Sequence, residues 1–243
     1  MRTFFTLWKR ELAALFLSPI AYVMMMFFLM VTGFGFYLLV KENLELAHAI
    51  QGLVVVIWAC MLVVLPILTM RTFAEERKNG TFETLMTAPV RESSVVLAKF
   101  AGVLTFFLMM CLPTLLYLLV IHRLAPDAVA LLDLGSVIGG YLAVSLIAAA
   151  FIALGMLASA LTSNQIIAAI SSFSVMSILW FGGLFLPTLS ATEIGQEISA
   201  YFSSALHLME ASRSVFDTRS IVLYLSLTFF FLFATIKAVE ARR

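Results

Sequence analysis

Six long runs of apolar residues, separated by shorter polar stretches, make up most of this chain. Each run is close to the roughly 20 residues that an α-helix needs to cross the hydrocarbon core of a bilayer. Apolar residues follow one another in these runs, whereas the strands of a membrane barrel would alternate apolar and polar positions. The runs therefore predict six transmembrane helices, at residues 19–40, 50–70, 100–121, 135–161, 166–186 and 221–239.

The fourth and fifth runs lie within one stretch, residues 134–192, that contains no Asp, Glu, Lys or Arg. Small and polar residues cluster at 159–165 (SALTSNQ), which is typical of a tight turn and divides the stretch into two helices. The fourth run also has two pairs of small residues spaced four apart, Gly135 with Gly139 and Gly155 with Ser159. Such pairs allow close helix approach in lipid, either within the chain or against another subunit.

Composition leads to the same protein class. Of the 243 residues, 63% are hydrophobic and 12% are charged, which is more apolar surface than a soluble domain of this size can bury. The first apolar run is long enough to span the membrane and follows a charged stretch, so no cleavable signal is expected. The sequence predicts an all-α integral membrane protein with a single transmembrane domain over residues 1–243.

The positions of Lys and Arg predict the orientation, because these residues concentrate in cytoplasmic segments. With the N-terminus placed in the cytoplasm, eleven of them fall on inner segments or span ends and four on outer ones. The inner set is Arg2, Lys9, Arg10, Arg71, Arg77, Lys78, Arg91, Lys99, Lys237, Arg242 and Arg243, and the outer set is Lys41, Arg123, Arg213 and Arg219. Both termini and residues 71–95 are therefore expected in the cytoplasm.

Residues 1–18 have the pattern of an amphipathic helix. Its apolar face consists of Phe4, Trp8, Leu12, Leu15 and Phe16, whereas Arg2, Thr6, Lys9 and Arg10 are polar or basic. This pattern predicts an interfacial helix with Trp8 at the level of the lipid headgroups.

The charged segment between the second and third runs, residues 71–95, predicts two short helices joined by a break. Residues 71–78 include good helix formers, and Asn79-Gly80 supplies a left-handed stop. Thr81 is placed to cap a second helix, with Glu83 in its first turn, where the helix dipole favours an anion. Two interpretations remain open here: a solvated loop that maintains topology, or a docking surface for a soluble partner.

Residues 187–220 form the longest outer segment. Apolar residues recur among its charged residues, which favours short amphipathic helices that return toward the membrane. Glu210 and Arg213 are three residues apart and are expected to pair on one helix face.

Several kinds of chemistry are missing from the chain. It has no Gly-x-x-x-x-Gly-Lys-Ser/Thr loop for nucleotide and no His-Glu-x-x-His motif. Cys60 and Cys111 each lie alone in a predicted span, and the three histidines match no zinc spacing. The only ionisable residue within a predicted span is Lys237, which lies near an inner end. We predict no catalytic, cofactor or metal site, so any energy for transport must come from another protein.

Four stretches together resemble the type-2 permeases of the ATP-binding-cassette (ABC) exporters. They are the FAEERKNGT core with its LMTAPV exit (73–90), SPIAY (18–22), LTSNQ (161–165), and LHLME (206–210) followed by SVFDTR (214–219). The likeness is closest to the gliding-motility and copper-enzyme-maturation branch and covers nearly the whole chain. The sequence departs from that pattern at Ser214, where a glycine is usual, and at Ser220, where an acidic residue is usual.

The resemblance implies a six-helix half-transporter in a bacterial-type inner membrane, paired with a second copy or a sister permease. Two copies of a separate ABC ATPase subunit would bind ATP and Mg, so the chain itself would not be an enzyme and would hold no cofactor. The implied coupling residues are Phe73, Glu75, Glu76, Arg77, Lys78, Gly80, Thr81, Phe82, Glu83 and Leu85, and the implied outer-segment residues are His207, Glu210, Arg213 and Asp217.

Within the coupling set, charged residues 75–78 would supply complementarity to the ATPase, and Phe73, Phe82 and Leu85 would be its apolar anchors. The partners implied are the ATPase, the second permease and the bilayer, with no nucleic acid. Two alternatives stay open: a stand-alone channel or carrier, and a membrane scaffold of a motility or assembly machine.

Overall fold

The structure is a computed structural model of the chain, and all regular secondary structure in the residues described here is helical. These are residues 2–41, 46–80, 91–117, 120, 134–189, 201–215 and 217–241. Six of the helices are long and apolar enough to cross a membrane. The prediction of an all-α membrane protein with six spanning helices is therefore confirmed.

The spanning helices follow the predicted apolar runs. They are α2 (Pro19–Lys41), α3 (Leu46–Thr69), α6 (Glu92–Cys111), α9 (Leu134–Leu161), α10 (Gln165–Leu189) and α13 (Thr218–Glu240). Three further helices are α1 (Arg2–Phe16), α4 (Arg71–Lys78) and α12 (Ser204–Ala211). The largest departure at a helix start is α6, which begins eight residues before its predicted start, so that residues 92–95 belong to this span and not to the loop before it.

Helix α9 is the centre of the bundle. It packs against α13, α3, α10, α12, α4 and α6. Its small residues make this possible: a Cβ atom on Gly140 would lie 2.8 Å from a Val54 methyl group of α3, and one on Gly155 would collide with the Thr69 hydroxyl. The small residues of α9 at these positions therefore serve packing within the chain.

The two prolines in the second and third runs have different effects. Pro66 lies inside α3, which continues past it to Thr69. Pro113 lies in a short 3₁₀ turn, η1 (Leu112–Thr114), that follows the end of α6. Each proline lacks the N–H for the α-helical hydrogen bond, and the helix type changes only at the second site.

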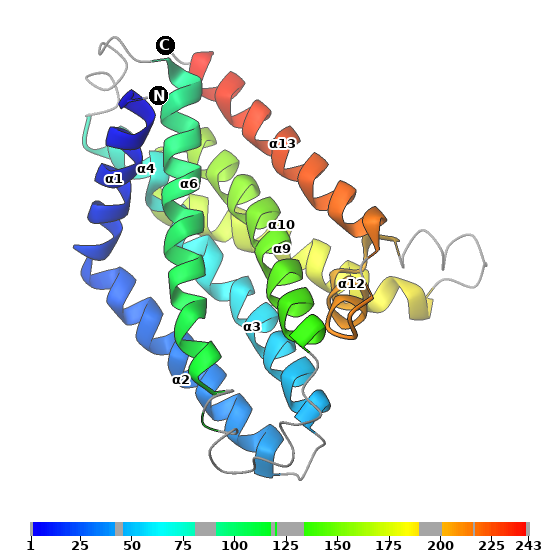
Figure 1. Cartoon of the computed structure of the whole chain (residues 1–243). Helices are drawn as coiled ribbons and strands as arrows, with labels where there is room; N and C mark the ends of the chain where they lie inside the picture. The colour runs from blue at the N-terminus through cyan, green and yellow to red at the C-terminus, as the bar shows by residue number, and fades with distance from the viewer. Residues whose placement is uncertain are drawn as a thin grey trace.

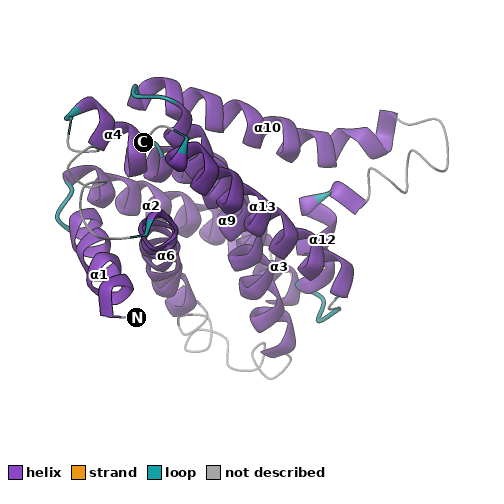
Figure 2. Ribbon diagram, turned by 90° about the horizontal axis from the view of Figure 1, so that it is seen from above, coloured by secondary structure: helices purple, strands orange, loops and turns teal. Residues whose placement is uncertain are grey.

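Both chain termini lie at the same end of the bundle, and α4 is near that end (Figure 1). Helix α1 runs beside α6, and α10 runs along the outside of the bundle, where it contacts α9 and α3 (Figure 2). Few residues in the apolar windows of α2, α10 and α13 are buried in the single chain. Large apolar side chains such as Phe34, Phe173 and Phe229 cover these helices, as expected of surfaces that face lipid or another membrane subunit.

Candidate coupling site

Helix α4 is embedded in the bundle by its first turn. Thr72, Phe73 and Ala74 are buried, and Phe73 is 0% exposed. Toward the other end of the helix, Lys78, Asn79 and Gly80 are exposed. This charged helix is therefore buried at its start and exposed at its end.

The start of α4 is capped by a side chain from α9. Helix N-termini leave backbone N–H groups without partners inside the helix, and no residue of α4 caps its own start. The Ser159 hydroxyl accepts hydrogen bonds from the N–H groups of Phe73, at 3.1 Å, and Ala74, at 3.0 Å. It also donates to the Met70 carbonyl at 3.0 Å. Because Ser159 is 0% exposed, this is a dry attachment of α4 to the central helix.

The end of α4 agrees with its sequence. Gly80 has a φ of +69°, and a Cβ at this position would meet nothing within 4 Å, so glycine is selected by backbone conformation and not by space. Arg77 and Lys78 lie in the last turn, where the helix dipole favours cations. The predicted stop at Asn79-Gly80 is confirmed. The second helix and its predicted residues Thr81, Phe82, Glu83 and Leu85 lie outside the described residues.

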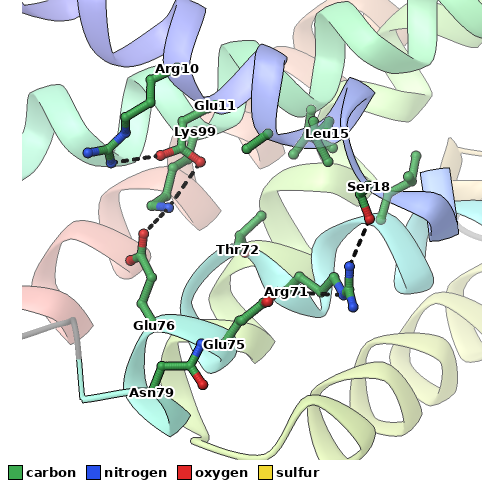
Figure 3. Close-up of a pocket in the computed structure, with 13 residues that line it drawn as sticks. Arg10, Glu11, Leu15, Ser18, Arg71, Thr72, Glu75, Glu76, Asn79 and Lys99 are labelled. Carbon is green, nitrogen blue, oxygen red and sulfur yellow. Dashed lines mark hydrogen bonds and ion pairs between the residues drawn. The ribbon is translucent and has the colours of Figure 1, made fainter.

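A buried lysine joins α4 to two other helices (Figure 3). Lys99 of α6 has a side chain that is 3% exposed, and its Nζ lies 3.2 Å from Glu11 Oε2 of α1 and 2.6 Å from Glu76 Oε1 of α4. The same ammonium lies 5.5 Å from the ring centroid of Phe73, within cation–π range. A buried cation requires such partners because it has lost its hydration. We refer to Glu11, Lys99 and Glu76 as the Lys99 triad.

The approach of α1 to α6 explains how Glu11 reaches the triad. Gly102 has no side chain, and a Cβ there would lie 3.2 Å from the Cβ of Glu11. Trp8 donates a hydrogen bond to the Thr105 hydroxyl at 3.3 Å, and Phe16 packs edge-to-face on Phe106. The apolar face predicted for residues 1–18 is therefore formed, but Trp8, Leu12, Leu15 and Phe16 pack within the chain.

Between α1, α4 and α6 lies an open cavity of about 770 Å³, which we call the α1–α4 crevice. Its polar lining consists of Arg10, Glu11, Ser18, Arg71, Thr72, Glu75, Glu76, Asn79 and Lys99, and its apolar lining of Ala14, Leu15, Leu68 and Val103. Arg71 bridges its two sides, because it donates to the Ser18 hydroxyl at 2.9 Å and lies 3.5 Å from Glu75.

The predicted coupling residues divide into two groups. Glu75, Lys78 and Gly80 are accessible, and the side chain of Glu75 is 41% exposed. Phe73 was predicted to be an anchor for a partner protein, and this is wrong in the structure because its side chain is buried against the chain's own core. Glu76 is committed to Lys99, and Arg77 is half-buried, so neither is a free surface charge.

Three residues of this site do not follow from sequence reasoning: Glu11, Ser159 and Lys99. Lys99 had a detectable signal, since it is the single charged residue in segment 95–107. Ser159 is one member of the predicted small-residue pair Gly155 and Ser159. A spacing of four residues predicts close packing of helices, and it does not predict the hydrogen bonds that Ser159 makes to α4. The partners of the triad are 88 and 23 residues apart in the chain, so only the folded structure brings them together.

The predicted outer-segment residues lie within α12 (His207, Glu210) or shortly after it (Arg213, Asp217), where they have structural roles. His207 is buried, and its Nδ1 lies 3.1 Å from the Tyr224 hydroxyl of α13. Asp217 caps α13 by accepting a hydrogen bond from the Arg219 N–H at 2.8 Å. The predicted Glu210–Arg213 ion pair is not among the ion pairs of the described residues; instead the Arg213 N–H donates to the Glu210 carbonyl at 3.0 Å.

Ser214, where the resemblance expects glycine, has a φ of +62° and is the one non-glycine residue with positive φ in the part of the chain that the structure describes. This left-handed conformation is strained by a Cβ atom, by roughly 1–2 kcal/mol. The Ser214 hydroxyl lies 3.2 Å from that of Ser136, a contact that offsets part of the strain. The conformation thus gives a physical reason for a glycine at this position.

We expect α12 to loosen from α13 as the pH falls. Burial lowers the pKa of His207 below its ordinary value of 6.5, and Glu210 and Asp217 act in the opposite direction. A group with a lowered pKa in the folded state contributes stability that is present above pH 6.5 and is lost as the pH falls below it. Hydrogen exchange at the α12 amides should therefore accelerate between pH 7.5 and pH 5, after correction for the intrinsic rate. His207→Gln should remove this dependence; an unchanged dependence in that variant would contradict the assignment.

Comparison with known proteins agrees with this architecture. The family model described as "ABC-2 family transporter protein" matches residues 39–236, which is more than half of the chain and includes α3 to α12 and most of α13. Helix α1 and most of α2 lie before the match. No curated protein matches the chain.

Proposed function

Because the chain belongs to the ABC-2 family of transporter proteins, a multi-pass membrane family, we propose that it is the permease subunit of an exporter driven by a separate ATPase. The observation that supports this most strongly is α4, a charged helix fixed at one end to the membrane-spanning body and accessible at the other. The proposed topology places α4 and both termini in the cytoplasm of a bacterial-type inner membrane.

The attachments of α4 suit it to transmit a displacement. Ser159 links its first turn to α9, and Glu76 links it through Lys99 to α6 and α1. Packed helices respond to force as rigid units because protein interiors are close-packed. A movement imposed on the exposed end of α4 would therefore move α1, α6 and α9 together.

The accessible end of α4 presents Glu75, Lys78 and the turn at Gly80 to a partner. We propose that an ABC ATPase contacts this surface, together with residues 81–90, and that Glu75 and Lys78 set its register. ATP and Mg are bound by that partner, two copies of which serve a pair of permeases. The exposed apolar faces of α2 and α10 are the surfaces available for a second permease.

Charge placement favours this function over an ion-driven carrier. Carriers of that kind keep ionisable residues at membrane depth to carry the coupling charge. Lys99 is a buried cation, and in the predicted topology it lies at the inner end of a span. Its two carboxylate partners belong to α1 and α4, which are not spanning helices. In the described parts of α3, α9 and α10 there is no Asp, Glu, Lys or Arg to continue a path across the membrane.

Charge reversal at Glu75 tests the function. Glu75→Arg should lower association with the ATPase at least tenfold, because an exposed charge at an interface governs complementarity more than folding. The measurement is co-purification of the ATPase with the permease, together with ATP hydrolysis by the complex. Membrane insertion and thermal stability of the variant should match those of the wild type.

Glu240→Arg is the matched control, since Glu240 is also an exposed carboxylate in an ion pair and lies at the C-terminal end of α13. This control should bind the ATPase normally. Glu76→Arg should differ from both by destabilising the permease itself. Full ATPase binding and activity in the Glu75 variant would refute the proposed docking surface.

A further inference from the structure

The α1–α4 crevice has the size and the lining of a ligand site. Its volume of about 770 Å³ is within the range of roughly 300–1,000 Å³ for small-molecule pockets. Apolar side chains, including Leu15, Leu68 and Val103, form one part of its wall, and charged groups form the rest. An occupant must therefore offer an apolar part and a polar part.

The charges of the crevice are balanced. Arg10, Arg71 and Lys99 are matched by Glu11, Glu75 and Glu76. A balanced lining favours neither a simple anion nor a simple cation, because either would leave opposite charges desolvated without compensation. A ligand that carries both signs at short separation satisfies such a lining.

Four of these residues are already paired with one another. Lys99 lies between Glu11 and Glu76, at 3.2 and 2.6 Å, and Arg10 lies 3.1 Å from Glu11. Arg71 and Glu75 are different, because they are partly exposed, at 31% and 41%, and their charged atoms are 3.5 Å apart. Such a long, partly exposed pair contributes little stability and is easily opened by a ligand.

Arg71 and the groups beside it provide an anion position. Its Nη1 donates to the Ser18 hydroxyl at 2.9 Å, and Ser18 immediately precedes α2, which begins at Pro19. A guanidinium, a hydroxyl and the positive end of a helix dipole are together suited to a phosphate group. Glu75, one helical turn from Arg71, provides the position for an adjacent ammonium (Figure 3).

We propose that the α1–α4 crevice binds the headgroup of a zwitterionic phospholipid of the ethanolamine type. The phosphate contacts Arg71 and the Ser18 hydroxyl, the primary ammonium donates hydrogen bonds to Glu75, and the start of the acyl chains lies on Leu15, Leu68 and Val103. A choline headgroup lacks the N–H donors for Glu75, and a glycerol headgroup lacks the cation. That the lipid comes from the cytoplasmic leaflet rests on the orientation given under the proposed function.

Native mass spectrometry of the full-length permease in detergent tests this proposal. The protein is incubated with equal amounts of phospholipids that share acyl chains and carry ethanolamine, choline or glycerol headgroups. The ethanolamine lipid should give the dominant adduct, and Arg71→Gln should lower its bound fraction about tenfold or more, as expected for the loss of a charged hydrogen-bonding partner. Arg71→Lys should retain part of the binding.

Lys237→Gln is the matched control, because Lys237 is a cation of a different ion pair, with Glu240, outside the crevice. This control should leave the lipid adducts unchanged. Should Arg71→Gln fail to fold, Glu75→Gln tests the ammonium position by itself, and it should reduce the preference for ethanolamine over choline to less than twofold.

Three results would overturn the proposal. They are equal adducts of the three lipids, equal losses in the Arg71→Gln and Lys237→Gln variants, and soluble glycerophosphoethanolamine binding as tightly as the intact lipid. The last result would mean that the crevice recognises a free phosphodiester. Because no ATPase is present in this experiment, its outcome is independent of whether α4 docks one.

Discussion

Replacement of Lys99 by methionine is expected to lower the free energy of unfolding of the permease by about 2–4 kcal/mol. Removing one partner of a buried ion pair leaves the opposite charge uncompensated, at a typical cost of about 3–5 kcal/mol. The expected value is set somewhat lower because the side chains of Glu11 and Glu76 are 19% and 21% exposed and retain some hydration. Reversible unfolding in mixed detergent micelles measures this difference.

Two companion variants separate the Lys99 triad from a general effect of charge loss. Glu76→Gln in the Lys99→Met background should restore part of the lost stability, since it removes one uncompensated carboxylate. Lys237→Met removes a cation whose pair with Glu240 is exposed on both sides, so it should cost less than about 1 kcal/mol. Equal destabilisation by Lys99→Met and Lys237→Met would show that the triad does not hold the helices together.

Replacement of Ser159 by alanine should have a comparable effect on stability, about 2–4 kcal/mol, with a clear local signature. It leaves two buried N–H groups of α4 and the Met70 carbonyl without the partner that they have in the wild type, and each such loss typically costs about 1–3 kcal/mol. Hydrogen exchange at the amides of Phe73 and Ala74 should accelerate at least tenfold. The loss of coupling to α9 should also lower transport driven by the ATPase.

Ser145→Ala is the matched control on the same helix, because the Ser145 hydroxyl donates only to the Leu142 carbonyl of its own helix at an exposed site. This variant should leave both the stability and the exchange of α4 nearly unchanged. If Ser159→Ala matched this control at the Phe73 and Ala74 amides, the capping of α4 by α9 would be refuted.

The spanning helices were predictable because length and hydropathy alone determine whether a segment crosses a bilayer. The end of α4 was predictable for a different local reason, since glycine readily adopts the left-handed conformation that ends a helix, as Gly80 does here. The third span was started at residue 100 because Lys99 interrupts the apolar run, whereas α6 already begins at Glu92. A charge within a span becomes acceptable when a partner neutralises it, and the partners of Lys99 are distant in the sequence.

The contacts of the α4 side chains, in contrast, could not be predicted from the sequence. An eight-residue helix has too few turns for its apolar pattern to show which neighbour its apolar face meets, and Phe73 was assigned to a partner protein from the family resemblance alone. The structure places it against Lys99 and the chain's own core. The stripe of α1 was likewise identified correctly as apolar, whereas its contact with α6 depends on Gly102 and Thr105, which lie far along the chain.

The most direct test of the central claim is site-specific photocrosslinking from position 78, at the exposed end of α4, in membranes that contain the assembled transporter. We predict a crosslink to a protein that carries a Gly-x-x-x-x-Gly-Lys-Ser/Thr nucleotide loop, and no such crosslink from the same probe at the exposed residue Met209 of α12. Crosslinks from position 78 to lipid or to other permease copies alone would contradict the claim that an ATPase drives this protein through α4.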